Sequence, residues 1–261
     1  MIIGGLLRNA VAAEWTKLRS VRSTYWSVLI AVVLGIGLSA AISAGVGSSF
    51  KDMSIADQLT FDPAEISLAG LHFAQLALGV LAILTVSAEY SSGTVRTTFS
   101  AIPRRGYVLA AKALVIGLTV AVIGIGTAFG AFAIGQLVLG HYGLSVSLSH
   151  PGVTRAVIGG GLYITALALF ALGLAVIIRH TAGAITALVG VVFILPPVTF
   201  LLPDAWQRNF SRYLPANAGN QITTTITERN ALGPWTGYGV FLAWTVLFLG
   251  IGWYLLRTRD V

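Results

Sequence analysis

The sequence predicts an all-α integral membrane protein with six transmembrane helices, an N-terminal interfacial amphipathic helix and both termini cytoplasmic. Of its 261 residues, 56% are hydrophobic and only 10% are charged, with a mean hydropathy of +0.85. A soluble domain carries about a quarter charged residues, so this chain needs lipid around much of its surface. Its uncharged runs reach the roughly 20 residues that a membrane span requires. The basic residues concentrate on one side of those runs, which sets the orientation.

Six uncharged runs divide the chain, which we interpret as a single transmembrane domain. Between the spans lie a cytoplasmic loop at 89–107 and an extracellular segment at 203–234. With the N-terminus inside, the outer segments hold few of the 16 Lys and Arg, namely Lys51, Arg155, Arg208, Arg212 and Arg229. The predicted spans are approximately 25–47, 66–88, 108–139, 153–178, 182–202 and 235–256.

Local signals fix some helix ends. Asp62-Pro63-Ala64-Glu65 places an Asp at the N-cap, a Pro at the first helical position and a Glu at the third, which predicts a helix start. Pro196-Pro197 lies inside the fifth run, and proline removes a helix hydrogen bond. The fifth helix should therefore kink or end early.

Residues 2–24 have the pattern of a helix lying on the inner membrane surface. Apolar residues recur at helical spacing between basic ones, and one of them is a tryptophan. Such a helix either anchors the first span or also forms part of a docking surface for a cytoplasmic partner. Its candidate residues are Trp15, Lys17, Arg19 and Arg22.

A short amphipathic helix is predicted between the second and third spans. Val95, Phe99 and Ile102 fall on one helical face, Ser91-Ser92-Gly93 interrupts the chain before them, and Pro103 ends the pattern. A helix of about two turns is marginal in water, so the membrane surface or another protein must hold it. An ordinary inner loop with positive-inside arginines explains the same residues.

The sequence contains no set of residues that is typical of an enzyme active site. The sequence contains no GxxxxGK[ST], HExxH or GxSxG motif and no cysteine, so we predict no catalytic, cofactor-binding or metal-binding residue. The net charge of +7 is explained by the basic residues that orient the chain in the membrane, so we predict no nucleic-acid partner. An ion-coupled carrier is disfavoured, because no acidic or basic residue falls well inside a span.

Several segments resemble the permease subunits of ABC-2-type exporters, especially actinobacterial ones. The resemblance covers nearly the whole chain. It is carried by EWTKLRSVRSTYW, EYSSGTVRTTFSAIPRR, RHTAGAI, YLPANAG and RTRDV.

The resemblance implies that the loop between spans two and three carries a coupling helix for a separate ABC ATPase subunit. Glu89 would mark the membrane boundary, paired with an inner arginine. ATP and Mg would be bound by that partner and not by this chain. The implied coupling residues are Glu89, Gly93, Thr94, Val95, Arg96, Phe99, Ile102, Arg104 and Arg105.

The resemblance also implies a dimer, formed with a second permease copy or a paralogue in the bacterial plasma membrane. The complex would export a hydrophobic or amphipathic small molecule, such as an antibiotic or other toxic compound. The alternative is a non-transporting membrane anchor or regulatory subunit. Segment 203–234 would carry short helices that dip into the outer leaflet, although a surface loop fits its composition equally. The implied substrate-path residues are His72, Phe73, Gln75, Leu76, Phe193 and Thr199.

Overall fold

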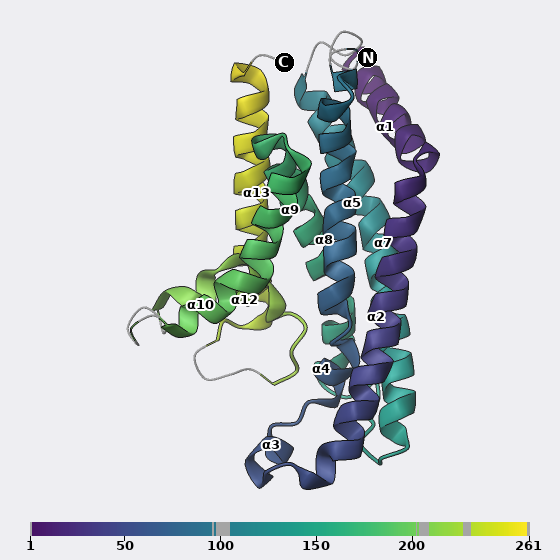
Figure 1. Cartoon of the computed structure of the whole chain (residues 1–261), viewed down its shortest axis with the longest axis vertical. Helices are drawn as coiled ribbons and strands as arrows, with labels where there is room; N and C mark the ends of the chain where they lie inside the picture. Colours follow the sequence, from purple (N-terminus) through teal and green to yellow (C-terminus); the bar gives the residue numbers. More distant parts are fainter. Residues whose placement is uncertain are drawn as a thin grey trace.

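The chain folds into an elongated bundle of helices (Figure 1). This computed structural model describes residues 2–95, 97, 105–201, 203, 209–226 and 231–259, with the backbone alone for residues 2–6 and 200. Within those ranges the regular elements are helices and helical turns, and no strand occurs. The first helix and the last turns of the final helix lie at one end of the bundle, here named the terminal end. The opposite end is the distal end.

Six helical segments in the described ranges are long and apolar enough to cross a membrane. The predicted all-α fold with six membrane-spanning helices is therefore confirmed. The segments are Arg22–Asp52, Pro63–Ser91, Arg105–Gly140, Val153–Ile178, Thr181–Val198 and Pro234–Thr258.

The N-terminal helix is separate from the first span. Helix α1 (Ile2–Ser20) ends where Val21 takes an extended conformation, and α2 (Arg22–Ser49) then begins. The buried face of α1 contains Ala10, Glu14 and Leu18, at spacings of four residues. A carboxylate thus occupies the middle of the face that packs on the bundle.

The second span is broken near its start. After the turn η1 (Phe50–Asp52) and α3 (Ile55–Leu59), Asp62 caps the short helix α4 (Pro63–Leu68) through bonds from the Ala64 and Glu65 amides, as predicted. Helix α5 (Leu71–Ser91) follows the break. At Gly70 an added Cβ would lie 2.2 Å from the Gly35 oxygen, so only glycine permits this approach to α2.

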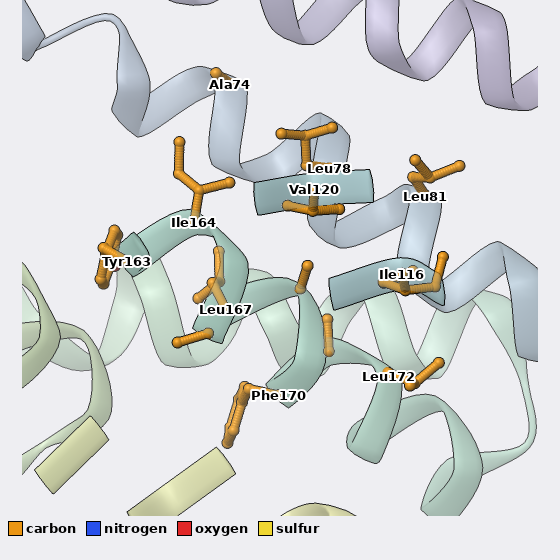
Figure 2. Close-up of a cluster of buried hydrophobic side chains, with 14 of the residues drawn as sticks. Ala74, Leu78, Leu81, Ile116, Val120, Tyr163, Ile164, Leu167, Phe170 and Leu172 are labelled. Carbon is orange, nitrogen blue, oxygen red and sulfur yellow. The ribbon is translucent and has the colours of Figure 1, made fainter. Parts of the chain in front are cut away.

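Three helices form the centre of the bundle: α5, α7 (Arg105–Gly140) and α8 (Val153–Ile178). Their buried side chains interdigitate in Figure 2, with Leu78 and Leu81 from α5, Ile116 and Val120 from α7, and Ile164 and Leu167 from α8. All six are at most 1% exposed. This packing supplies the rigid frame on which the polar regions are built.

The fifth span is interrupted, as Pro196-Pro197 predicts. Helix α9 (Thr181–Val189) passes into the π-helical turn η2 (Gly190–Ile194), then α10 (Leu195–Val198) and η3 (Thr199–Leu201). Prolines at 196 and 197 lack the N–H that an α-helix needs and crowd the preceding turn. The chain responds by widening that turn and changing direction, so that α10 points away from the bundle (Figure 1).

The last part of the chain returns along the bundle. It comprises η4 (Ser211–Tyr213), α12 (Pro215–Asn220) and α13 (Pro234–Thr258). Gly219 packs between Phe241 of α13 and Tyr163 of α8, which leaves no room for a larger residue. Segment 211–222 is therefore inserted between helices α8 and α13.

Candidate functional site

A cavity of about 520 Å³ lies in the distal half of the bundle, between the first turns of α5, the interrupted fifth span and segment 211–222. Polar side chains form one part of its wall and apolar ones the other. The lining residues are His72, Gln75, Tyr163, Val192, Phe193, Pro196, Pro197, Thr199, Ser211, Arg212, Ala216, Asn217, Asn220, Gln221, Ala231 and Leu232.

The break in the fifth span shapes the apolar part of this wall. Val192 and Phe193 belong to the π-helical turn, and Pro196 and Pro197 to the short helix after it. The hydroxyl of Thr199 is bonded back to the Pro196 oxygen at 2.6 Å. A continuous α-helix would direct these side chains differently, so the prolines determine what lines the cavity.

Two charged residues hold the opposite wall in place. Asp62 accepts bonds from the backbone amide and the hydroxyl of Thr225 while its other oxygen caps α4. Arg155 donates to the Ile222 oxygen at 3.1 Å and the Thr224 oxygen at 2.9 Å. Segment 211–226 is thereby tied to α4 and α8, and the cavity has a defined far wall.

Arg212 is partly buried and lies beside the middle of helix α13. The indole of Trp244 donates to the backbone oxygen of the neighbouring Tyr213 at 2.9 Å, and Trp244 stands near the middle of the 25-residue helix α13. The Arg212 guanidinium lies 5.0 Å from the centre of the Tyr213 ring. Its Nε is buried and has no hydrogen-bond partner.

A second polar region, the ionic cluster, lies near the terminal end and consists of Glu14, Lys17, Glu89 and Lys112. Lys112 contacts Glu14, lies 3.1 Å from Glu89, and donates to the Thr85 oxygen at 2.9 Å. Lys17 lies 2.9 Å from Glu14 and 2.8 Å from Glu89. Two carboxylates and two ammonium groups thus alternate and join α1, α5 and α7.

Lys17 keeps its positive charge at neutral pH. Partial burial alone would lower the pKa of Lys17, but hydrogen bonds to Glu89 and Glu14 outweigh it and raise the pKa above its ordinary 10.5. The stabilisation from Lys17 is therefore complete below that value and is lost only as the pH rises through the raised pKa.

Beside the cluster lies a cavity of about 450 Å³ between α1, the start of α2, α5 and α7. Apart from the cluster and Thr85, its walls include Leu81, Leu84 and Val115. Along α5, His72 of the first cavity and Glu89 of the cluster are separated by roughly 25 Å, at 1.5 Å per helical residue. The two polar regions are therefore distinct. No three His, Asp or Glu side chains in the described ranges gather as metal ligands.

A family model described as ABC-2 family transporter protein matches residues 10–197, most of the chain and all of α2 to α9. The chain belongs to the ABC-2 transporter family. A search of curated proteins finds no match. Membership of this family makes the chain a multi-pass membrane permease component of an ABC transporter, which is a transport subunit and not itself catalytic. Permeases of this family generally dimerise and work with an ABC ATPase subunit.

The residues of this ABC-2 permease that were predicted to couple to an ATPase, where the structure describes them, lie toward the terminal end of the bundle. Helix α5 ends at Ser91, as predicted, and Gly93 follows with a φ of 71°. Val95 is buried, and Thr94 lines the cavity beside the cluster. Arg105 donates to the oxygens of Leu256 and Arg259 at the end of α13. Four predicted residues lie outside the described ranges, namely Arg96, Phe99, Ile102 and Arg104.

Glu89 was expected to pair with an inner arginine, and this is wrong. Its partners are Lys17 and Lys112. Lysine fits because the two ammonium groups, as compact charges, can each bridge two carboxylates. Among the residues predicted for the interfacial helix, Lys17 faces the cluster, whereas Trp15, Arg19 and Arg22 are exposed.

The predicted substrate-path residues divide into two groups. His72, Gln75, Phe193 and Thr199 line the 520 Å³ cavity, although they come from two separate spans. Phe73 and Leu76 do not line it, and Phe73 is 43% exposed. The structure thus brings four of the candidates to one place and leaves two outside it.

Sequence reasoning missed Glu14, Lys112 and Arg212 as members of these regions. Glu14 lies at helical spacing from Ala10 and Leu18, which is the signal that could have placed it on a buried face. Lys112 follows an apolar stretch at the start of the third span. No sequence pattern indicates the depth of Arg212, because that depends on the bond between Tyr213 and Trp244.

Proposed function

We propose that this ABC-2 permease moves a hydrophobic or amphipathic small molecule out of a bacterial cell through the 520 Å³ cavity. Two permease chains in the plasma membrane, with cytoplasmic termini, would work with two ATPase subunits that bind ATP and Mg. The observation that carries the proposal is the cavity itself. It combines apolar and polar walls, as small-molecule sites do, and it is built from the second and fifth spans of a transport subunit.

Docking of the ATPase on the loop at 89–107 is the second part of the proposal. Glu89, in the last turn of α5 just before that loop, is tied to α1 through Lys17 and to α7 through Lys112. A displacement of the loop would therefore be passed to three helices together. Because α5 runs from this cluster to His72 and Gln75, it provides a direct mechanical connection to the cavity.

Co-purification tests the docking. The tagged chain is extracted in mild detergent from its native membrane, beside a variant carrying Phe99→Asp and Arg96→Glu. We expect an ABC ATPase to accompany the natural chain and to be lost from the variant. The matched control makes similar charge changes at the distal end, Ile55→Asp with Lys51→Glu, where both side chains are exposed. Equal recovery of the ATPase from all three samples would exclude this loop as the docking site.

Transport is tested by ATP hydrolysis of the reconstituted complex. Candidate amphipathic compounds should stimulate it in the natural complex, and Gln75→Trp, which fills the cavity, should abolish the stimulation while leaving basal hydrolysis intact. Unchanged stimulation in that variant would show that cargo takes another path.

A further inference from the structure

We propose that the cavity selects cargo with an anionic group, bound by Arg212, together with a hydrogen-bond donor that reaches Gln75. The inference rests on the proposed function, since it names the class of molecule carried by the same cavity. The apolar part of such a molecule would contact the wall formed by Phe193, Pro196 and Pro197. The cargo is therefore an anionic amphipath, such as a long-chain acyl derivative with a carboxylate and an amide or hydroxyl.

The first argument is the depth of Arg212. Tyr213 is bonded to Trp244 in the middle of α13, and Gly219 lies against Phe241, one turn closer to the start of that helix. Segment 211–219 thus runs alongside the interior of a membrane-spanning helix. A charged side chain at such depth is costly to hold, and its presence usually marks a pathway or a binding site.

The second argument is the absence of a counter-charge. Arg212 forms no ion pair with any carboxylate in the described ranges, and its buried Nε has no hydrogen-bond partner. No acidic residue occurs among the described residues that line the cavity. Glu65, which is exposed, lines a smaller neighbouring cavity that does not include Arg212. An anion entering the cavity would supply the missing partner, whereas a cation would be repelled.

The third argument comes from Gln75, which is 1% exposed. Its amide nitrogen donates to the His72 oxygen at 2.9 Å, and its Oε1 is buried without a partner. Buried acceptors are rarely left unpaired. Because Gln75 lines the cavity, a donor on the cargo can satisfy this oxygen while the anionic group reaches Arg212.

Three other polar side chains of the lining are already engaged in hydrogen bonds within the chain. Asn217 donates to the Ser211 oxygen at 2.9 Å, and Thr199 is bonded to Pro196. Gln221 is bonded to the Asn217 oxygen at 3.4 Å. A cargo that engages Arg212 and Gln75 would be recognised through one charge and one hydrogen bond beside the apolar part of the wall, in the manner of small-molecule sites.

Binding to the full-length chain tests this. The chain is reconstituted in nanodiscs of neutral phosphatidylcholine, and equilibrium dialysis measures three labelled probes with the same acyl chain: N-lauroylglycine, its neutral glycinamide and lauroylcholine. Empty nanodiscs give the background from lipid partitioning. We expect N-lauroylglycine to bind about 10- to 100-fold tighter than the neutral probe, the range for a charge-assisted hydrogen bond, and lauroylcholine to bind weakest.

Variants separate charge from packing. Arg212→Gln should remove the preference for N-lauroylglycine, and Arg212→Lys should keep most of it. Gln75→Leu should weaken both amide-bearing probes by about 5-fold, as expected for one lost hydrogen bond. Lys51→Gln is the matched control, since it removes a positive charge from an exposed distal position outside the cavity. Thermal unfolding of each variant confirms that it is folded.

Two results would overturn the inference in different ways. If all three probes bind equally to the natural chain and to Arg212→Gln, the cavity takes amphipaths without charge selection, and only the further inference fails. If no probe exceeds the empty-nanodisc background, the cavity is not a cargo site, and the proposed function fails with it.

Discussion

The two polar regions of this permease handle charge in opposite ways. In the ionic cluster, two carboxylates and two lysines satisfy one another, with Glu14 and Lys112 almost completely buried. In the cavity, Arg212 has no acidic partner among the residues that the structure describes, and Gln75 has an open acceptor. The difference indicates that buried polar and charged side chains have two roles in this membrane helix bundle. Balanced charges join helices to each other, whereas unbalanced ones leave a position that another molecule can complete.

The largest effect is expected when one charge is removed from the ionic cluster. Lys112→Met leaves Glu14 and Glu89 facing each other with Lys17 as their one remaining cation among the described residues. Removing one partner from a buried pair costs about 3–5 kcal/mol. We expect a large fall in the melting temperature of the detergent-purified chain. Lys17→Met is the comparison, because the Lys17 side chain is 42% exposed, and its effect should be clearly smaller. Equal effects would mean that burial does not decide the strength of the cluster.

Removing Glu14 together with Lys112 should restore part of the stability that Lys112→Met loses. Lys112→Met with Glu14→Leu leaves the Lys17–Glu89 pair in place and no uncompensated carboxylate on α1. We expect about 1–3 kcal/mol of stability to return relative to Lys112→Met, as coupled residues do not act additively. Arg19→Met, on an exposed position of the same helix, serves as the second-site control and should add nothing. A double variant less stable than Lys112→Met would contradict the pairing.

A moderate effect is expected at Asp62, which helps to form the cavity wall. Asp62→Ala removes an N-cap, worth about 0.5–2 kcal/mol, together with the bonds to Thr225. Protease cleavage within residues 203–234 should become faster. Asp57→Ala is the matched control, since Asp57 is exposed and lies on the same side of the bundle. Unchanged cleavage in Asp62→Ala would show that Arg155 alone holds the segment.

The smallest effect on stability should come from Arg212. Because this cation forms no ion pair within the described part of the chain, Arg212→Gln should change the free energy of unfolding by less than about 0.5 kcal/mol, or raise it. Thermal unfolding beside Lys112→Met makes the comparison directly. A loss as large as that of Lys112→Met would place Arg212 among the structural charges, and the distinction between the two regions would fail.

Local patterns predicted the parts of the fold that depend on neighbours in sequence. The uncharged runs identified six spans, Asp62-Pro63 a helix start, and Pro196-Pro197 a break. The interruption at Gly70 was not predicted, because it depends on the approach of Gly35 and Ser39 from another helix. Composition cannot report such a contact.

In the candidate site, too, contacts between residues distant in sequence were not predicted. The second and fifth spans were identified as contributors to a cargo path through family resemblance, and four of their residues line one cavity. The ionic cluster was missed because Glu14 and Lys112 are far apart in sequence and each looks like an ordinary cytoplasmic charge. The apolar spacing on α1 predicts a stripe that contains Trp15, whereas the structure buries Glu14 and leaves Trp15 46% exposed. An ion pair across helices can outweigh the local apolar pattern.

The π-helical turn at Gly190–Ile194 sets the rotation of the cavity wall that follows it. A π turn contains an extra residue relative to an α turn, so its conversion to α-helix would rotate everything beyond it by about 100°, the angle of one residue in an α-helix. Pro196, Pro197 and Thr199 lie beyond it and line the cavity. A shift of hydrogen-bond register by a single residue would exchange the surface presented to cargo, without unfolding the span or moving the central helices.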